Sequence, residues 1–499
     1  MNSALIIQAG GKGSRLLGEN AAFSKVYFCY KGKSILKYWQ ENFSAFEVSA
    51  IINKGFENIF PNENVFYSDE QNGDFSDLFS QVAKTTKDRV VIVWSDYIIK
   101  EEFLNDVFDL VVHNDKNVIG STSDLNCRIK FKEKDNQEGF FGFMKVSAKN
   151  LKTPAFLLKA LQHKCFEDFY NNENIFEFFD EIYSFPQGSL VDLGTRDEAK
   201  KLPVEYSGNS GSTITYLNSG FVQKSFPSVA VMENEQRWYK HFYPEIDDTP
   251  PRNPGYYNSD RYLILKELRP YFSLKEEERP TIDQIVASID EYQRKNPMLR
   301  PDGKGLIVED SFPKRIYNYI YDTPRISEGT KKGGRKHRKE KEIRLIADAL
   351  CNEINEFEKD NLFPLSRHGD TTLSNLCLDE NNKIIWIDPR PGTFCFSSIF
   401  DYAKLYYSLC GYDVVNTCRY SVLKEGDKLT IDFFDGQKMP SLYKKDLGGF
   451  KWQTLALFLP IFWLSFYDLS ILTKNCQKAF FAKAMFDHFC EEIMKEKLV

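Results

Sequence analysis

The sequence predicts an α/β protein of at least two domains, with a mostly parallel sheet in its first part and a mixed α+β region after it. Over about the first 200 residues, short apolar strands alternate with helix-like stretches, a pattern typical of a parallel sheet with crossover helices. After Pro203, threonine, isoleucine, tyrosine and valine alternate around glycines, which favours antiparallel hairpins. At 499 residues the chain is also longer than one ordinary core.

The first part begins with the apolar strand ALIIQA (4–9), which runs into a glycine-rich turn. The helix and strands expected after it are, in order, SILKYWQENF (34–43), VSAIIN (48–53), NVFY (64–67) and RVVIVW (89–94). The pattern closes near LVDLGTRDEAKKLP (190–203), so we place the domains at 1–203 and 204–499.

The second part begins with the expected hairpins of residues 204–226 and becomes helical after about residue 275. Its clearest helical patterns are PTIDQIVASIDEYQRK (280–295) and KEIRLIADALCNEINEFEK (341–359). The apolar run LALFLPIFWLSF (455–466) is shorter than a bilayer span of about 20 residues and contains Pro460. We expect a buried helix there, with an interfacial segment as the alternative.

Composition and charge narrow the class of protein. The formal net charge of −6 gives no overall attraction to nucleic acid or to anionic lipid. The 10 cysteines form no C-x-x-C pair, which argues against a zinc site or a disulfide framework. The N-terminus lacks the basic leader and long apolar run of a signal peptide. A cytoplasmic protein without stable membrane insertion is therefore expected.

A first candidate site lies where the first strand breaks into Gly10, Gly11 and Gly13, followed by Arg15. Glycines let the backbone approach a phosphate, and its amides supply donors. A plain tight turn is the alternative. A dinucleotide fingerprint is excluded because its third glycine would fall at Leu16.

Three charged residues accompany this turn. Lys25 follows Arg15 by ten positions, and Asp96 comes directly after the strand RVVIVW and one serine. A carboxylate at the carboxyl end of a parallel strand faces the ligand crevice. A second such carboxylate is Asp192 in LVDLGT, although it could instead cap the helix RDEAKK.

These motifs resemble the sugar-phosphate and phosphocholine nucleotidyltransferases, a family with a Rossmann-like fold. Their pattern is A-G-G-x-G-x-R-L, a lysine in a P-K pair, a strand ending in aspartate, and a late D-x-G-T. The resemblance implies that the glycine loop and Arg15 hold a nucleoside triphosphate, that Lys25 contacts its phosphates, and that Asp96 and Asp192 carry Mg²⁺. One departure is Ser24, where the family has proline.

A second candidate site is HGDTTLSN (368–375), followed by the strand KIIWI and Asp388. In phosphoryl transfer from ATP, one carboxylate orients and deprotonates the attacking hydroxyl, while an amide oxygen and a second carboxylate hold Mg²⁺. Asp370, Asn375 and Asp388 have the order and spacing for these three roles. A polar loop between two strands is the simpler alternative.

This segment resembles the choline kinase and aminoglycoside phosphotransferase families, which share the two-lobed protein-kinase fold and write the loop as H-G-D-x-x-x-x-N. The resemblance implies a small lobe over about residues 204–270 and a helical lobe over about 271–499. It also implies that Lys224 contacts the ATP phosphates with Glu235 as its partner, and that Asp401 lies on a helix supporting the loop. Peptide substrates are not implied, because Gly369 and Pro389 depart from the protein-kinase pattern.

Together the two sites predict a bifunctional enzyme with Mg²⁺ at both sites. One half phosphorylates a small alcohol, amino alcohol or sugar with ATP. The other half transfers a nucleotidyl group to that phosphate, with CTP favoured and GTP or UTP possible. The product is an NDP-activated precursor for capsule or another surface polysaccharide.

Two alternatives belong to other classes of function. Only one half could be catalytic, with the other acting as a nucleotide-binding regulator. The chain could also bind nucleic acid through the basic run of residues 331–344, KKGGRKHRKEKEIR. The acidic balance of the chain and the lack of interleaved aromatic residues argue against that second alternative.

Overall fold

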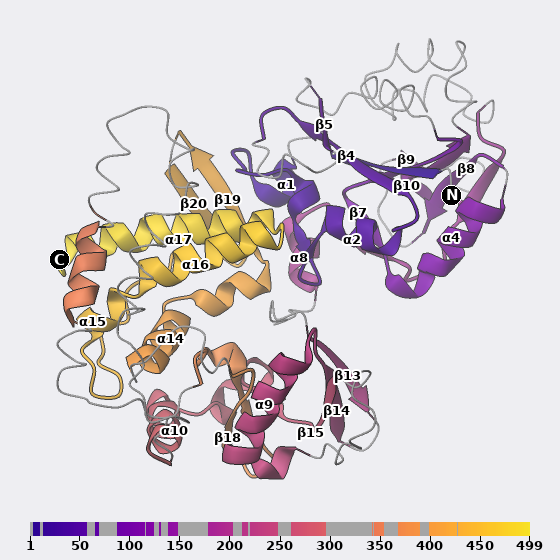
Figure 1. Ribbon diagram of the computed structural model, residues 1–499. Coiled ribbons are helices and arrows are strands. Elements are labelled where there is room, and N and C mark those ends of the chain that lie inside the picture. Colours follow the sequence, from indigo (N-terminus) through magenta and orange to yellow (C-terminus); the bar gives the residue numbers. More distant parts are fainter. Residues whose placement is uncertain are drawn as a thin grey trace. The chain divides into compact units, whose positions relative to one another are not determined.

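The structure is a computed structural model, and it divides the chain into two compact units (Figure 1). Unit 1 comprises Met1–Glu205, Thr417–Met439 and Phe466–Ala484, and unit 2 comprises Tyr206–Asn416, Pro440–Ser465 and Met485–Val499. The residues that the structure describes are 3–9, 13–56, 65–68, 87–114, 116–123, 129–130, 138–147, 178–202, 212–217, 220–247, 261–295, 342, 344–353, 368–389, 399–426 and 428–499.

Unit 1 is built on a sheet with the strand order β11-β8-β10-β6-β1-β4-β5, and β9 pairs with β10. The strands are β1 (Ser3–Ala9), β4 (Glu47–Asn53), β5 (Val65–Ser68), β6 (Arg89–Trp94), β8 (Val118–Thr122), β9 (Ile129–Lys130), β10 (Gly139–Ser147) and β11 (Glu181–Ser184). The pairs β1–β4, β1–β6, β4–β5 and β8–β11 are parallel, whereas β10 runs antiparallel to its neighbours. The predicted mostly parallel sheet is confirmed.

The central strands are apolar because both faces of the sheet are covered. Leu5 and Ile7 of β1, Ala50 of β4 and Val91 of β6 are all fully buried. The helices of this part are α1 (Ser14–Leu17), α2 (Ile35–Asn42), α4 (Leu104–His113) and α8 (Arg196–Lys201), and α2 and α4 lie on the same side of the sheet (Figure 1). Small two-stranded sheets pair β2 (Cys29–Tyr30) with β3 (Lys33–Ser34) and β7 (Tyr97–Ile99) with β12 (Leu190–Asp192).

Unit 1 also contains a hairpin and helical residues from the C-terminal part of the chain. The hairpin consists of β19 (Tyr420–Glu425) and β20 (Lys428–Phe433). The backbone amide of Ala22 donates to Val422 O at 2.7 Å, and Cys29 N donates to Gln477 Oε1 at 2.7 Å. These later segments therefore complete the core of unit 1.

Unit 2 contains a three-stranded antiparallel sheet of β13 (Thr213–Leu217), β14 (Phe221–Ser225) and β15 (Tyr262–Lys266), with α9 (Val229–Phe242) between the last two strands in the chain. The hairpin predicted after Pro203 is thus present as β13 and β14. A second small sheet joins β16 (Arg269–Pro270), β17 (Leu376–Leu378) and β18 (Ile384–Trp386).

The remaining helices are α10 (Ile282–Lys295), α14 (Ile399–Leu409), α15 (Trp452–Ala456), α16 (Leu459–Leu472) and α17 (Cys476–Lys495). The predicted helix at 280–295 is confirmed as α10. Of the helix predicted at 341–359, the described residues 344–353 are helical.

The apolar run of residues 455–466 forms helix over most of its length, and its side chains from Leu455 to Leu459 are all buried, as predicted. The stretch Trp452–Leu472 is long and apolar enough to cross a membrane by length and composition alone. Because 61% of its most apolar window is buried within the protein, the stretch also fits the core helix of a soluble protein.

Candidate active sites

Unit 1 gathers three of the predicted residues around Asp96. Lys25, the first residue of the 3₁₀ helix η1 (Lys25–Tyr27), places Nζ 2.6 Å from Asp96 Oδ1. Arg15 of α1 places Nη2 3.0 Å from Asp96 Oδ2. Lys25 is only 4% exposed, and its burial lowers its pKa, although the carboxylate of Asp96 opposes that shift. The site thus holds two cations beside one carboxylate at the end of β6.

Asp192 lies beside Asp96 because β12 pairs with β7. Asp192 is opposite Tyr97 in this pairing, and Leu193 N donates to Asp96 O at 2.7 Å. Burial raises the pKa of Asp192, and the nearby Asp96 carboxylate adds to that rise. Two carboxylates in such proximity favour a bound cation, since positive charge between them relieves their repulsion.

The alternative role of Asp192, as the cap of α8, is wrong. The N-cap of that helix is Thr195, whose Oγ1 accepts from Glu198 N at 3.3 Å. Asp192 Oδ1 instead accepts from Gly194 N at 2.5 Å. A side chain at Gly194 would place its Cβ 2.8 Å from Asp192 Oδ1 and 3.9 Å from Asp96 Oδ2, so glycine keeps the space beside both carboxylates open.

The glycine turn is described only in part, because Gly10 and Gly11 lie outside the described residues. Gly13 has φ 65°, a left-handed conformation that glycine adopts without strain. A Cβ at Gly13 would lie 3.3 Å from Lys25 Cβ. The turn therefore brings the backbone close to the buried lysine.

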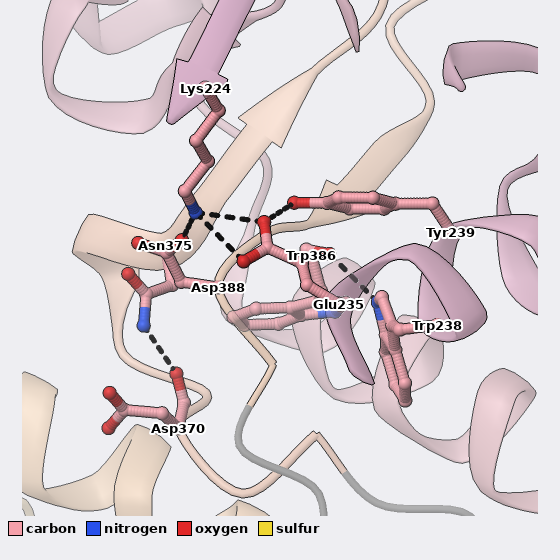
Figure 2. Close-up of polar contacts among 8 residues, drawn as sticks. All are labelled: Lys224, Glu235, Trp238, Tyr239, Asp370, Asn375, Trp386 and Asp388. Carbon is pink, nitrogen blue, oxygen red and sulfur yellow. Dashed lines mark hydrogen bonds and ion pairs between the residues drawn. The ribbon is translucent and has the colours of Figure 1, made fainter. Parts of the chain in front are cut away.

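Unit 2 gathers the second set of predicted residues, which Figure 2 shows in close-up. Lys224 of β14 places Nζ 2.8 Å from Glu235 Oε1 and 3.0 Å from Oε2. The same ammonium contacts Asp388 Oδ1. Lys224 and Glu235 are 5% and 4% exposed, so the ammonium joins a buried carboxylate on α9 to a partly exposed one after β18.

The HGDTTLSN loop lies next to this ion cluster. Asn375 Nδ2 donates to Asp370 O at 2.8 Å (Figure 2). Ile387 N donates to Asn375 O at 2.9 Å, which ties the loop to the chain just before Asp388. The side-chain nitrogen of Asn375 is engaged in this bond, so its oxygen is the atom suited to a metal. Asp388 has φ 57°, a strained conformation for a residue with a Cβ and one that clusters at functional sites.

Asp401, the predicted support of the loop, is fully buried under it. Its carboxylate accepts from His368 N at 3.1 Å and from Gly369 N at 2.8 Å, and Tyr292 Oη donates to it at 2.7 Å. These bonds fix the backbone just before Asp370. The loop is therefore held in place by the buried carboxylate of Asp401 on α14, in the supporting role that the resemblance implied for it.

Several residues of this site were not predicted. Lys404 of α14 places Nζ 3.3 Å from Asp370 Oδ1. Tyr239 donates to Glu235 Oε1 at 2.6 Å, and Trp238 Nε1 donates to Trp386 O at 3.1 Å (Figure 2). Lys404 stands three residues after Asp401 on the same helix, so helical spacing placed it near the loop. Tyr239 likewise stands four residues after Glu235 on α9, whereas Trp238, which contacts Trp386, carries no such signal.

The donor sets of both sites suit Mg²⁺. Within the described ranges, no group of three or more His, Cys, Asp and Glu side chains is arranged to hold a metal ion. Mg²⁺ in nucleotide enzymes, however, is held by one or two carboxylates together with substrate phosphates. The pair Asp96 and Asp192 meets that requirement in unit 1, and Asn375 with Asp388 meets it in unit 2.

No protein-family model matches the chain, and no curated protein matches it either. Solved structures match over about its N-terminal 40%. They include an inositol-1-phosphate CTP transferase from T. maritima (10% identity, TM-score 0.31, 40% of this chain and 91% of that one), a CTP:phosphocholine cytidylyltransferase from Streptococcus pneumoniae (18%, 0.30, 40% and 97%) and a 4-diphosphocytidyl-2C-methyl-D-erythritol synthase from Anaerococcus prevotii (16%, 0.29, 39% and 94%). Identities and TM-scores this low do not assign the chain to a family.

Proposed function

We propose that the chain is a bifunctional transferase that phosphorylates a small alcohol with ATP and then couples the phosphate to a nucleotide. The observation that carries this proposal is the presence of two separate clusters of lysine and carboxylate side chains, one in each unit. One cluster surrounds Asp96 and the other surrounds Lys224. Each cluster lies beside a loop whose sequence motif predicts phosphate chemistry.

In unit 1, Arg15 and Lys25 bind the triphosphate of the nucleotide. A phosphate oxygen of the second substrate attacks the α-phosphorus, a new P–O bond forms, and pyrophosphate leaves. Both reactants are anionic, so cations at this position lower the barrier by neutralising their repulsion. Asp96 and Asp192 are the residues that would hold a Mg²⁺ ion, which would supply further positive charge at this position. The glycines at 10, 11 and 13 let the backbone approach the phosphates.

In unit 2, Asp370 orients the acceptor hydroxyl and takes its proton as the γ-phosphorus is attacked, and ADP leaves. Lys224 binds the ATP phosphates, and Glu235 holds its ammonium in place. Asn375 and Asp388 are the residues that would hold a Mg²⁺ ion, which would neutralise charge on the phosphate oxygens. In the structure Lys224 contacts both Glu235 and Asp388, so the three side chains already form one connected cluster.

The two reactions form a sequence, because the phosphate ester made in unit 2 is the nucleophile required in unit 1. The favoured second nucleotide is CTP, with GTP or UTP possible. The product is an NDP-activated building block of the kind used for surface polysaccharide, made in the cytoplasm. A regulatory role for one half is disfavoured, because both halves retain their lysines and carboxylates.

The proposal is tested by ³¹P NMR of the protein with Mg²⁺, ATP, CTP and a panel of small alcohols and sugars. We expect a phosphate ester first and a diphosphate-linked nucleotide later. Asp370→Asn should abolish the ester at unchanged fold, because volume is conserved while the base is lost. Asp283→Asn, an exposed aspartate of α10, is the matched control. Ester formation by Asp370→Asn at the wild-type rate would refute the kinase assignment.

A further inference from the structure

Lys404 places a positive charge beside Asp370, the proposed base of the kinase site. Its ammonium lies 3.3 Å from Asp370 Oδ1, and the two side chains are only 18% and 10% exposed. An acceptor hydroxyl that donates to Asp370 must lie within hydrogen-bond distance of the same carboxylate. Any acceptor in that position is therefore also within reach of the lysine ammonium.

The ammonium of Lys404 also lies over aromatic rings. Its Nζ is 4.7 Å from the ring centroid of Phe462, 5.6 Å from that of Tyr407 and 5.9 Å from that of Phe400. Rings at such distances attract a cation through their quadrupoles, as aromatic rings do in sites for quaternary ammonium ligands. In this protein the chain's own lysine occupies them.

The charges of Asp370 and Lys404 disfavour acceptor molecules that carry either a positive or a negative charge. A cationic acceptor meets the Lys404 ammonium at close range and finds the rings already occupied. An anionic acceptor meets Asp370 itself, together with the γ-phosphate of ATP in the proposed reaction. A built-in repulsive charge of this kind is a common source of specificity.

An uncharged acceptor with neighbouring hydroxyl groups satisfies both side chains. One hydroxyl donates to Asp370, and the oxygen of the next accepts from Lys404 Nζ. Burial and, to a smaller degree, Tyr412 and Asp370 raise the pKa of the nearby Tyr407 hydroxyl. The Tyr407 hydroxyl is buried without a hydrogen-bond partner among the residues that the structure describes.

We infer that the acceptor of the kinase site is an uncharged polyol or sugar and that Lys404 determines this specificity by excluding cationic amino alcohols. The inference rests on the proposed kinase function of unit 2 and names its substrate class. Lys404 acts on the acceptor directly, so it affects different acceptors in different directions. A residue that only stabilised the loop would change all of them alike.

The test compares kcat/KM for ATP-dependent phosphorylation of glycerol, sorbitol and glucose with that of choline and of glycerate. For the unsubstituted protein we expect the best neutral acceptor to exceed both charged ones by about tenfold or more. Lys404→Met should lower kcat/KM for the neutral acceptor about tenfold and raise it for choline, whereas Lys404→Arg should retain the original ranking. The matched control is Lys383→Met, because Lys383 also pairs with a carboxylate, Glu245, and lies 5.5 Å from the centroid of a tyrosine ring.

Three outcomes would overturn the inference. The first is a preference of the unsubstituted protein for choline or glycerate, a result that needs no variant to fold. The second is an equal change for all acceptors in Lys404→Met. The third is the absence of phosphorylation with every acceptor together with the absence of ATP binding measured by calorimetry. This third outcome would also overturn the kinase function, whereas the first two would leave the kinase function standing.

Discussion

The ammonium of Lys224 is shared between two carboxylates, and this arrangement has consequences for stability as well as for chemistry. Lys224 and Glu235 are nearly inaccessible to solvent, and Asp388 carries backbone strain beside them. A buried ion pair adds little net stability compared with apolar residues, but removal of one partner leaves an uncompensated charge in the interior. The cluster is therefore better explained by its use than by its contribution to folding.

Lys224→Met should accordingly destabilise unit 2 by about 3 kcal/mol, because the Glu235 carboxylate loses its cation. The double variant Lys224→Met/Glu235→Leu should recover part of that loss, as thermal unfolding would show. Lys383→Met removes an exposed ion pair with Glu245 and should change stability by no more than about 1 kcal/mol. Strictly additive losses in the double variant would contradict the coupling of Lys224 with Glu235.

Asp413 is a second buried carboxylate near the loop, and sequence reasoning did not single it out. It accepts from Ser374 N at 3.2 Å and from the Ser408 hydroxyl. Burial raises the pKa of Asp413 to about 6. Since the unfolded chain has the ordinary value of about 4, the folded protein binds this proton more tightly. The stabilisation of the folded state by this tighter proton binding is fully present below about pH 4, and it is lost as the pH rises through about 6.

The loss between those two pH values is on the order of 3 kcal/mol, from about 2 pKa units at 1.36 kcal/mol each. Asp413→Asn keeps the side-chain shape and an acceptor for Ser374 N, but it removes the ionisation. The variant should therefore gain stability relative to the unsubstituted protein as the pH rises from about 4 to about 7. Melting temperatures of both proteins across this range provide the measurement, and a difference that does not change with pH would contradict the assignment.

Among the strands of unit 1, β10 approaches β6 more closely than an ordinary side chain allows. Gly142 of β10 has φ 101°, and a Cβ at this position would overlap the indole of Trp94. Trp94 ends β6, and its Nε1 donates to Gln8 Oε1 of β1 at 2.9 Å. Asp96 follows two residues later, so this close packing positions the start of the candidate metal site.

Gly142→Ala should destabilise unit 1 by about 3 kcal/mol, because left-handed strain and overpacking both contribute. It should also slow nucleotidyl transfer, measured as pyrophosphate release, by displacing Trp94 and the chain to Asp96. The control is Gly188→Ala, since Gly188 has φ 77° but no described atom lies within 4 Å of the position that its Cβ would take. Equal losses in the two variants would show that the contact with Trp94 is unimportant.

The pattern of strands and helices is also where sequence reasoning succeeded best. The apolar runs that became β1, β4 and β6 were found because parallel strands buried on both faces need continuous apolar residues, whereas β5 is a partly exposed edge strand. Asp96 and Asp388 were predicted because each closely follows an apolar strand. Asp370 was predicted because it belongs to the spaced motif HGDTTLSN. Trp238 escaped prediction because its contact with Trp386 joins distant parts of the chain and leaves no periodic signal in either part. Tyr239 and Lys404 were missed although helical spacing from Glu235 and Asp401 places them beside the site.

At the scale of the whole molecule, the structure divides the chain into two units whose segments could not be assigned from sequence patterns. The change of pattern near residue 203 lies close to the end of the first segment of unit 1 at Glu205. Nothing in the sequence indicated that Thr417–Met439 and Phe466–Ala484 belong to unit 1. Inside that unit, Arg196 pairs with Asp432, which is distant in sequence. A separate unit 1 ending at residue 203 should thus lack part of its core.

This organisation predicts how truncation will behave. A fragment of residues 1–203 omits the β19–β20 hairpin and Gln477, which bonds to Cys29 N. We expect the fragment to be poorly soluble or to melt at least about 10 °C below the full chain, because several kcal/mol of core packing are missing. Differential scanning calorimetry of both proteins gives the comparison. A fully stable fragment with unchanged nucleotidyl transfer would mean that the later segments are dispensable.

The two units are proposed to carry independent sites that act in sequence, and complementation between two inactive variants is the sharpest test of that division. Asp96→Asn should phosphorylate the acceptor and accumulate the ester, while Asp370→Asn should convert only an ester supplied ready-made. A mixture of the two, followed by ³¹P NMR with ATP and CTP, should restore the diphosphate-linked product because a small ester diffuses between molecules. Wild-type nucleotidyl transfer by Asp96→Asn, or no product from the mixture at unchanged circular dichroism, would contradict two independent sites acting in sequence.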